Sequence, residues 1–360
     1  MKSSSRKTRK PQATSAHEHA AYSRRSLLCR LGLTAVAGAE ASTLLSAPAA
    51  MASANQHAGM AIHGDEPHTP AFRGIVDPNE NGFDPMEILR DFDWGKVTRL
   101  PNGQTLREWE VNAIDKEIEV APGVKYPAWT FDGRVPGPTL RCNEGDLLRI
   151  NFGNGSQHPH TMHFHGIHTA AMDGVPGQGA GLIHPGERTT YEFTAEPFGL
   201  HLFHCHAEPL AEHIARGMYG TLIIDPKGGR AKADEMVMVQ GGYNTTFDGQ
   251  GNELYFVNGV PFAYMDRPIR VKKDQLVRIY LTNILEYDPI NSFHLHGNFF
   301  EYYPTGTRLE PSEFTDTISQ VQGQRGILEM RFPFTGRYMF HAHKTEFAEL
   351  GWMGFFEVVQ

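Results

Sequence analysis

The chain has 360 residues and an ordinary globular composition, with 40% hydrophobic and 21% charged residues. Such a chain can bury a sizeable core and has room for about two domains. The net charge is −8, but the first 54 residues carry eight Lys or Arg against two acids, so the remainder has a net charge of −14. A protein this acidic is poorly suited to nucleic acid, and we expect no nucleic-acid partner.

The first 54 residues have the three-part organisation of an export signal. A basic stretch with an arginine pair at residues 24–25 precedes a mildly apolar run that ends in ASA at residues 52–54. This pattern predicts a signal peptide, residues 1–54, and the paired arginines resemble the twin-arginine class. Gly, Ser and Glu40 dilute the apolar run, so we expect an exported, periplasmic or extracellular protein without a stable membrane anchor. Residues 55–85, rich in His, Gly and Pro, are expected to form an extended N-terminal arm.

The rest of the chain repeats itself. Four motifs recur in the same order, GDLLRI as DQLVRI, MHFHG as FHLHG, GLHLFHCH as GRYMFHAH and GMYGTLIID as GWMGFFEVV, at offsets of 129, 131, 137 and 134 residues. Segments 147–152, 189–193, 277–281 and 328–332 alternate or cluster apolar residues between turn formers, which predicts strands. Short strands, frequent Gly and Pro, and halves of about 130 residues predict an all-β chain of two β-sandwiches. We expect the boundary near residues 226–229 and a short helix over residues 211–216.

Histidines are paired at matching places in the two halves. The four His-x-His pairs are His163/His165, His204/His206, His294/His296 and His341/His343. Residues i and i+2 of a strand point to the same face, so each pair presents two imidazoles side by side. One such pair is commonly a polar surface feature. Four pairs in register instead predict a clustered metal site, and imidazole suits copper or zinc.

Cys205 lies between two of these histidines. If His204 and His206 point one way, Cys205 points the other way, where it can bind a second metal while it stays covalently joined to the first site. The further ligands available to it are His160, His213 and Met218. Two histidines and a cysteine with a weak axial methionine form the blue-copper arrangement.

The second half serves as an internal control for this second site. Asn291, Ala342 and Trp352 align there with His160, Cys205 and Met218, and no histidine matches His213. The second half therefore keeps its paired histidines and has lost the mononuclear site, so we expect that site only in the first half.

With these motifs the sequence resembles the multicopper oxidases, and within them the two-domain, laccase-like enzymes. The likeness covers nearly all of the chain after the signal, including the segment WTFDGRVPGPTLRCNEGD. It implies two cupredoxin-like Greek-key β-sandwich domains, residues 86–226 with the blue copper site and residues 227–360 without it. It also implies four coppers per chain, with type 1 copper on His160, Cys205, His213 and Met218, type 2 copper on His163 and His294, and a type 3 pair on His165, His204, His206, His296, His341 and His343.

The resemblance also implies an activity and an assembly. The expected reaction is one-electron oxidation of a reducing substrate, a phenol or an aromatic amine, coupled to the reduction of O₂ to water. The expected assembly is a homotrimer whose metal clusters form between subunits. Cys205, His204 and His206 would carry electrons between the sites, and Asp173 is a candidate for proton supply, as are Glu346 and Glu349. No role is assigned to His158, His168, His184 and His201.

Two alternatives stay open. Copper nitrite reductases share the two-domain architecture and the blue-copper pattern, but His163 aligns with their catalytic aspartate, and His206 stands where they need no ligand. A non-enzymatic blue-copper electron-transfer protein needs only the mononuclear site, and the four histidine pairs argue against it.

Overall fold

The computed structural model describes residues 73–360, which belong to one compact unit. The predicted signal peptide and the first part of the predicted arm lie outside these residues. Strands dominate the described chain, which confirms the prediction of an all-β fold. The helices are short: α1 Pro78–Asn81, α2 Pro85–Ile88, α3 Leu210–Ala215, α4 Ala263–Asp266, α5 Thr345–Glu349 and the 3₁₀ turn η2 Ala170–Met172. None of the helices between residues 73 and 360 is long and apolar enough to span a membrane.

The strands up to residue 225 form two sheets, which we call sheets I and II. Sheet I has the order β2-β3-β6-β8, with β4 paired to β3: β2 Lys96–Arg99, β3 Thr105–Ala121, β4 Val124–Phe131, β6 Leu147–Asn154 and β8 Arg188–Thr194. Sheet II has the order β1-β5-β10-β9-β7: β1 Phe92–Asp93, β5 Thr139–Asn143, β7 His163–Phe164, β9 Gly199–His204 and β10 Tyr219–Asp225. From β4 to β9 successive strands alternate between the two sheets, as in Greek-key sandwiches.

The strands from residue 234 onward form sheets III and IV. Sheet III has the order β12-β11-β14-β19-β16-β17: β11 Asp234–Tyr243, β12 Leu254–Val257, β14 Val277–Asn283, β16 Phe300–Pro304, β17 Glu313–Thr315 and β19 Arg325–Met330. Sheet IV has the order β13-β21-β20-β15-β18: β13 Ile269–Lys272, β15 Asn291–Leu295, β18 Thr317–Gln320, β20 Gly336–His341 and β21 Met353–Val359. The parallel pair β11–β14 repeats β3–β6, and β13–β21 repeats β5–β10. Three of the four predicted strand segments lie within β6, β8 and β14, whereas β19 ends two residues before the predicted end at residue 332.

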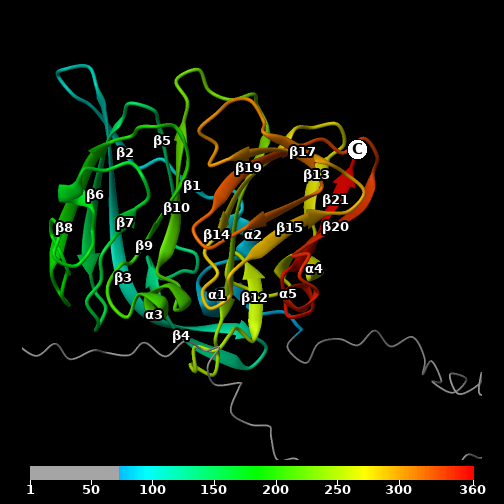
Figure 1. The fold of residues 1–360 in the computed structure, drawn as a ribbon, viewed down its shortest axis with the longest axis horizontal. Coiled ribbons are helices and arrows are strands. Elements are labelled where there is room, and N and C mark those ends of the chain that lie inside the picture. Colours follow the sequence, from blue (N-terminus) through cyan, green and yellow to red (C-terminus); the bar gives the residue numbers. More distant parts are fainter. Residues whose placement is uncertain (1–72) are drawn as a thin grey trace, which may run out of the picture. The chain divides into compact units, whose positions relative to one another are not determined.

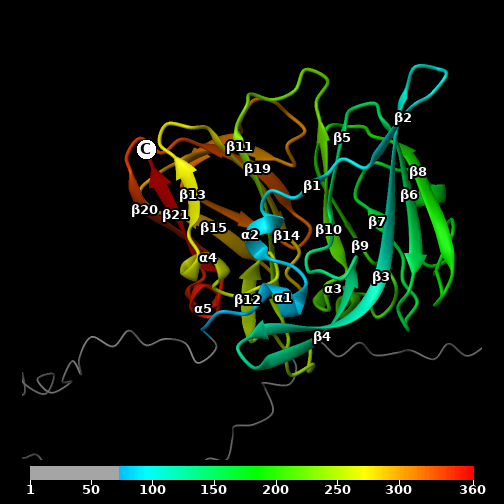
Figure 2. The same cartoon turned by 180° about the vertical axis from the view of Figure 1, so that it is seen from behind.

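The four sheets stack as layers in the order I, II, III, IV, with an apolar core between each neighbouring pair (Figures 1 and 2). The inner sheets are buried on both faces, so successive residues of their strands enter different cores. On β10, Leu222 and Ile224 enter the core between sheets I and II, and Ile223 enters the core between sheets II and III. On β11, Val237 also enters the core between sheets II and III, while Met236 enters the core between sheets III and IV.

The end of the predicted arm is not an extended linker. Asp77 and Asp84 begin α1 and α2, because each carboxylate accepts a backbone N–H two residues further on at 2.9 Å. Phe83 between these helices is buried in the core between sheets II and III. The expectation of an extended arm therefore does not hold for residues 78–81, which are helical.

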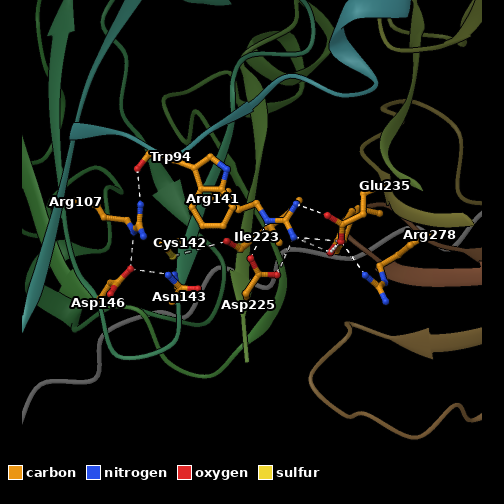
Figure 3. Close-up of polar contacts among 11 residues, drawn as sticks. Trp94, Arg107, Arg141, Cys142, Asn143, Asp146, Ile223, Asp225, Glu235 and Arg278 are labelled. Carbon is orange, nitrogen blue, oxygen red and sulfur yellow. Dashed lines mark hydrogen bonds and ion pairs between the residues drawn. The ribbon is translucent and has the colours of Figure 1, made fainter. Parts of the chain in front are cut away.

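A buried ion network joins the two halves (Figure 3). Arg141 on β5 donates two hydrogen bonds to Asp225, at 2.8 and 3.0 Å, and two to Glu235 on β11, at 2.8 and 3.2 Å. Glu235 also accepts a hydrogen bond from Arg278 at 2.8 Å. Burial alone would raise the pKa of Glu235, but the two guanidinium groups hold that pKa below its ordinary value. Because the side chains of Arg141 and Arg278 are only 9% and 2% exposed, both depend on carboxylate partners for their charge.

We predict that Glu235→Gln lowers the free energy of unfolding by about 2–3 kcal/mol, since it leaves buried positive charge undercompensated while each arginine keeps one other carboxylate. Chemical denaturation of the metal-free protein measures this change. The matched control is Glu192→Gln, which removes one partner of Arg149 in a half-exposed pair and is expected to cost less than about 1 kcal/mol. Equal losses for the two variants would contradict the role given to Glu235.

Candidate metal centres

Three side chains of the first half converge in the core between sheets I and II. His160 follows the turn after β6, Cys205 follows the last residue of β9, and His213 lies in α3. The Nδ1 atoms of the two histidines are 3.1 Å apart, and Cys205 Sγ is 3.6 Å from that of His160 and 3.2 Å from that of His213. A triangle with these sides has a centre about 2 Å from each atom, which is a metal–ligand distance. All three residues are buried, and we call them the buried cluster.

Met218, the expected fourth ligand, lies beside the buried cluster. Cys205 N–H donates to the Met218 carbonyl at 2.9 Å, and Met218 N–H donates to the His213 carbonyl at 3.2 Å. The Met218 side chain is fully buried in the same core as Cys205. Gly217 precedes it with a φ of +112°, and a Cβ there would come within 3.1 Å of the Trp129 carbonyl. This glycine therefore lets the segment approach β4 closely.

Burial keeps the imidazoles of the buried cluster neutral. It lowers the pKa of His160 to about 3 and the pKa of His213 to about 4. Both rings therefore have a free lone pair at neutral pH. Burial also raises the pKa of the Cys205 thiol to about 11. Since the thiolate is the form that binds metal ions, a bound cation would displace the thiol proton.

The paired histidines of the first half gather at the edge of sheet II. We call His163, His165, His204 and His206 the first quartet. The Nε2 atoms of His165 and His204 are 3.0 Å apart. The ring of His163 lies 5.3 Å from the ring of His204, its partner across the β7–β9 pairing, and 5.3 Å from that of His206. Four imidazoles thus lie close enough to share metal ions.

The paired histidines of the second half repeat this geometry on β15 and β20 of sheet IV and in the residues that follow these strands. We call His294, His296, His341 and His343 the second quartet. The Nε2 atoms of His296 and His341 are 2.9 Å apart. The ring of His294 lies 5.3 Å from that of His341 and 5.2 Å from that of His343. The repeat seen in the sequence is therefore a repeat of two half-sites.

Backbone carbonyls fix the protonated nitrogen in each quartet. A carbonyl oxygen can only accept, so an imidazole nitrogen that contacts it must carry the proton. His204 Nδ1 donates in this way to the carbonyl of Cys205 at 2.7 Å, and His341 Nδ1 donates to that of Ala342 at 2.7 Å. The Nε2 lone pairs of both rings are consequently free for a metal, which is the usual arrangement of a histidine ligand.

Asp173 lies against the first quartet. Its carbonyl accepts a hydrogen bond from His163 Nδ1 at 2.8 Å, and its Oδ1 is 3.0 Å from the same nitrogen and 3.5 Å from His168 Nε2. Gly174 permits this approach, because with a φ of +66° a Cβ there would lie 1.9 Å from the Met162 carbonyl. His168, to which the sequence analysis assigned no role, joins His163 and Asp173 in one group of possible ligands.

The two quartets do not meet within the described chain. Over residues 73–360, every aromatic-ring contact of a quartet histidine with another quartet histidine stays inside its own quartet. The second quartet is the more open of the two, with His296 and His343 exposed, whereas His204 in the first quartet is buried. One chain thus presents two separate half-sites.

Apolar side chains fill the place of the buried cluster in the second half. Ala342 N–H donates to the Trp352 carbonyl at 3.2 Å, and Trp352 N–H donates to the Phe347 carbonyl at 2.8 Å, which repeats the backbone bonds of the buried cluster. Phe347 therefore occupies the position of His213, and its ring stacks on Tyr255 with centroids 3.9 Å apart. In the second half, packed apolar side chains therefore stand where the mononuclear site was expected to be lost.

The other expected polar residues take different positions. Glu346 and Glu349 are exposed at α5. His201 is buried between the carbonyls of His165 and Pro197, at 3.2 and 2.9 Å, which gives it a structural role. His184 is exposed.

Sequence reasoning missed Trp129, whose ring lies 4.7 Å from that of His213 and 4.3 Å from that of His158. No spacing rule indicates this contact, because β4 reaches the buried cluster only through its pairing with β3.

The donor sets fit copper. Two imidazoles and a cysteine next to a methionine form the donor set of blue-copper sites, and quartets of imidazole also suit copper. The quartets contain no thiolate, so they differ in character from the buried cluster.

Comparisons with known proteins agree with this donor set. Two models of the multicopper oxidase family match, over residues 112–229 and 231–360. A solved multicopper oxidase is 65% identical, covers 79% of this chain and all of its own, and superposes with a TM-score of 0.78. A blue copper oxidase from Nitrosomonas europaea is 28% identical, covers 70% of this chain and 86% of its own, and has a TM-score of 0.65.

A copper-containing nitrite reductase of Neisseria meningitidis is 32% identical over 254 residues, which are 65% of this chain. The match spans 64% of that relative, less than two thirds of its length. Two family models in tandem, and a solved relative matched over its whole length, show that this chain of cupredoxin-like β-sandwiches belongs to the multicopper oxidases and is related to the copper nitrite reductases.

Proposed function

We propose that this chain is a laccase-like oxidase, which couples the one-electron oxidation of a small reducing substrate to the four-electron reduction of O₂ to water. Phenols and aromatic amines are the proposed substrates. The observation that carries the proposal is the presence of two matching quartets, the first of them joined to the buried cluster, since eight imidazoles are more than one metal ion takes. The likeness to nitrite reductases favours a second candidate, a nitrite reductase-like enzyme. That candidate assigns no ligand role to His163 and His206.

The proposal assigns each ligand. Type 1 copper is held by His160, Cys205, His213 and Met218, type 2 copper by His163 and His294, and the type 3 pair by His165, His204, His206, His296, His341 and His343. When bound, copper supplies one-electron transfer and the reduction of dioxygen. The protein tunes this chemistry through ligand identity, hydrogen bonding and burial.

The chain's own residues provide access and connection. A pocket next to the buried cluster is lined by Trp129, His158, Glu208 and His213, among others, and we place the reducing substrate there. Cys205 is joined through the backbone to His204 and His206, so a short covalent path connects the buried cluster with the first quartet. We propose Asp173 as the residue that supplies protons to the first quartet, a role supported by the 3.0 Å between its Oδ1 and His163 Nδ1.

A complete oxygen site then requires more than one chain. The two quartets lie apart in the described chain, and His296 and His343 of the second quartet are exposed. We propose a homotrimer in which the first quartet of one subunit faces the second quartet of the next. We also propose that the protein is exported through its twin-arginine-type signal.

The copper content tests the proposed function. We expect about four coppers per chain in the copper-loaded protein, together with a strong blue cysteine–copper band that Cys205→Ser removes. Elemental analysis and the visible spectrum measure both quantities on one sample. About two coppers would favour the nitrite reductase-like enzyme, and one blue copper would leave an electron carrier.

Mixed assemblies test whether the oxygen site lies between subunits. His206→Ala and His343→Ala are each expected to keep the blue band and lose oxidase activity. Co-expression of the two variants should restore about a quarter of the wild-type activity, because a quarter of the randomly formed interfaces combine two intact quartets. Each variant co-expressed with itself is the control. Activity that stays at the level of the single variants would contradict a site shared between subunits.

A further inference from the structure

A chain of hydrogen bonds leads from the surface to the buried cluster. Asp115, an exposed residue of β3, accepts a hydrogen bond through Oδ1 from the Ser156 hydroxyl at 2.6 Å. Ser156 Oγ is in turn 2.9 Å from Nε2 of His160. The other nitrogen of His160 faces Cys205 and His213. Asp115 and Ser156 are thus linked to a proposed copper ligand from the side opposite the metal.

The donors and acceptors around Ser156 allow one arrangement of protons. A hydroxyl has one proton to donate and two lone pairs to accept with. The Asp115 carboxylate can only accept, so it takes the hydroxyl proton. The backbone N–H of His158, 3.1 Å away, can only donate, so it takes one lone pair of Ser156 Oγ. The remaining lone pair must accept from His160 Nε2–H, which leaves Nδ1 of His160 unprotonated.

The surrounding backbone holds this chain of bonds in place. The second carboxylate oxygen of Asp115 accepts the N–H of Gln157 at 2.8 Å, and Ser156 N–H donates to Oδ1 of Asn154 at 3.0 Å. Asp115 is also the cross-strand partner of Trp129, whose ring contacts His160 at 5.7 Å. Ser156 is only 2% exposed, so water does not replace these bonds. The β3–β4 hairpin and the turn after β6 therefore act together to position His160.

We propose that Asp115 and Ser156 are positioning residues for the buried cluster, which hold His160 as its Nε2–H tautomer with the Nδ1 lone pair aimed at the metal. This inference rests on the proposed function for the identity of the metal. Hydrogen bonding of Nε2–H toward a carboxylate makes the imidazole a stronger donor, which favours the more highly charged metal ion. The pair therefore sets both the orientation of a ligand and the reduction potential of type 1 copper. Asp115 also lines the proposed substrate pocket, so one residue both borders the substrate and is hydrogen-bonded, through Ser156, to a copper ligand.

The tautomer can be tested without copper. In metal-free protein labelled with ¹⁵N-histidine, we expect His160 to be protonated at Nε2, with its resonances assigned by their loss in His160→Gln. Ser156→Ala should produce a mixture of tautomers, and Ser156→Thr, which retains the hydroxyl, should keep the Nε2–H form. Protonation at Nδ1 in the native protein, or an unchanged tautomer in Ser156→Ala, would overturn the proposal.

The reduction potential tests the consequence for copper. Asp115→Asn should shift the Cu(II)/Cu(I) equilibrium about tenfold toward Cu(I), which for one electron is a rise of about 59 mV. The matched control is Glu117→Gln, which removes an equal charge from an exposed residue that lines the same pocket. Equal shifts of the reduction potential in the two variants would show that the lost charge alone causes the change, and would overturn the role of the hydrogen bonds.

The two tests also separate this inference from the proposed function. A native protein that shows the Nε2–H tautomer but develops no blue band with copper would support the hydrogen-bonded chain and contradict the type 1 site. A blue band together with His160 protonated at Nδ1 in the metal-free protein would support the type 1 site and contradict the hydrogen-bonded chain. Should Ser156→Ala fail to fold, the tautomer of the native protein and the reduction potential of Asp115→Asn still decide the question, because neither measurement needs that variant.

Discussion

The register of β9 between its two neighbours determines where the candidate ligands of the first half lie. Pairing with β7 sets His204 opposite His163, and pairing with β10 sets it opposite Tyr219, so that the next residue, Cys205, bonds to the Met218 backbone. A slip of one residue would exchange the two faces of the strand and carry the thiol away from His160. In the second half, β20 lies between β15 and β21 in the same way, with His341 opposite His294. Both half-sites thus depend on sheet register more than on any single side chain.

The ligands were predictable from the sequence because their signal is local and repeated. His-x-His spacing and Cys205 between two histidines led to the groups that the structure brings together, even though β9 ends at His204 and the residues after it are not in a strand. Contacts between distant segments gave no such signal. Glu235 meets Arg141 across 94 residues of chain, and Ser156 meets Asp115 across 41 residues. The first contact depends on the stacking of sheets II and III and the second on the pairing of β3 with β6, and residue spacing encodes neither.

The two halves show what a sandwich of this kind does when it holds no mononuclear site. An unused set of buried imidazoles would lose its hydration without gaining a partner, which is costly. In the second half Phe347 and Trp352 fill that space with apolar contacts, and the surrounding backbone bonds are unchanged. The second quartet is retained beside this repacked core. The histidine quartet and the interior of the sandwich therefore vary independently of one another.

The enclosure of Cys205 also bears on the chemical durability of the protein before it acquires metal. Oxygen and peroxides attack thiolates far more readily than thiols, and they need access to the sulfur. Cys205 has no exposed surface, and burial raises its pKa to about 11, so at neutral pH almost none of it is in the reactive form. Cys142, the other cysteine among the described residues, is equally enclosed and its pKa is also raised. The same packing that shapes a ligand thus protects it from oxidants until a cation takes the place of its proton.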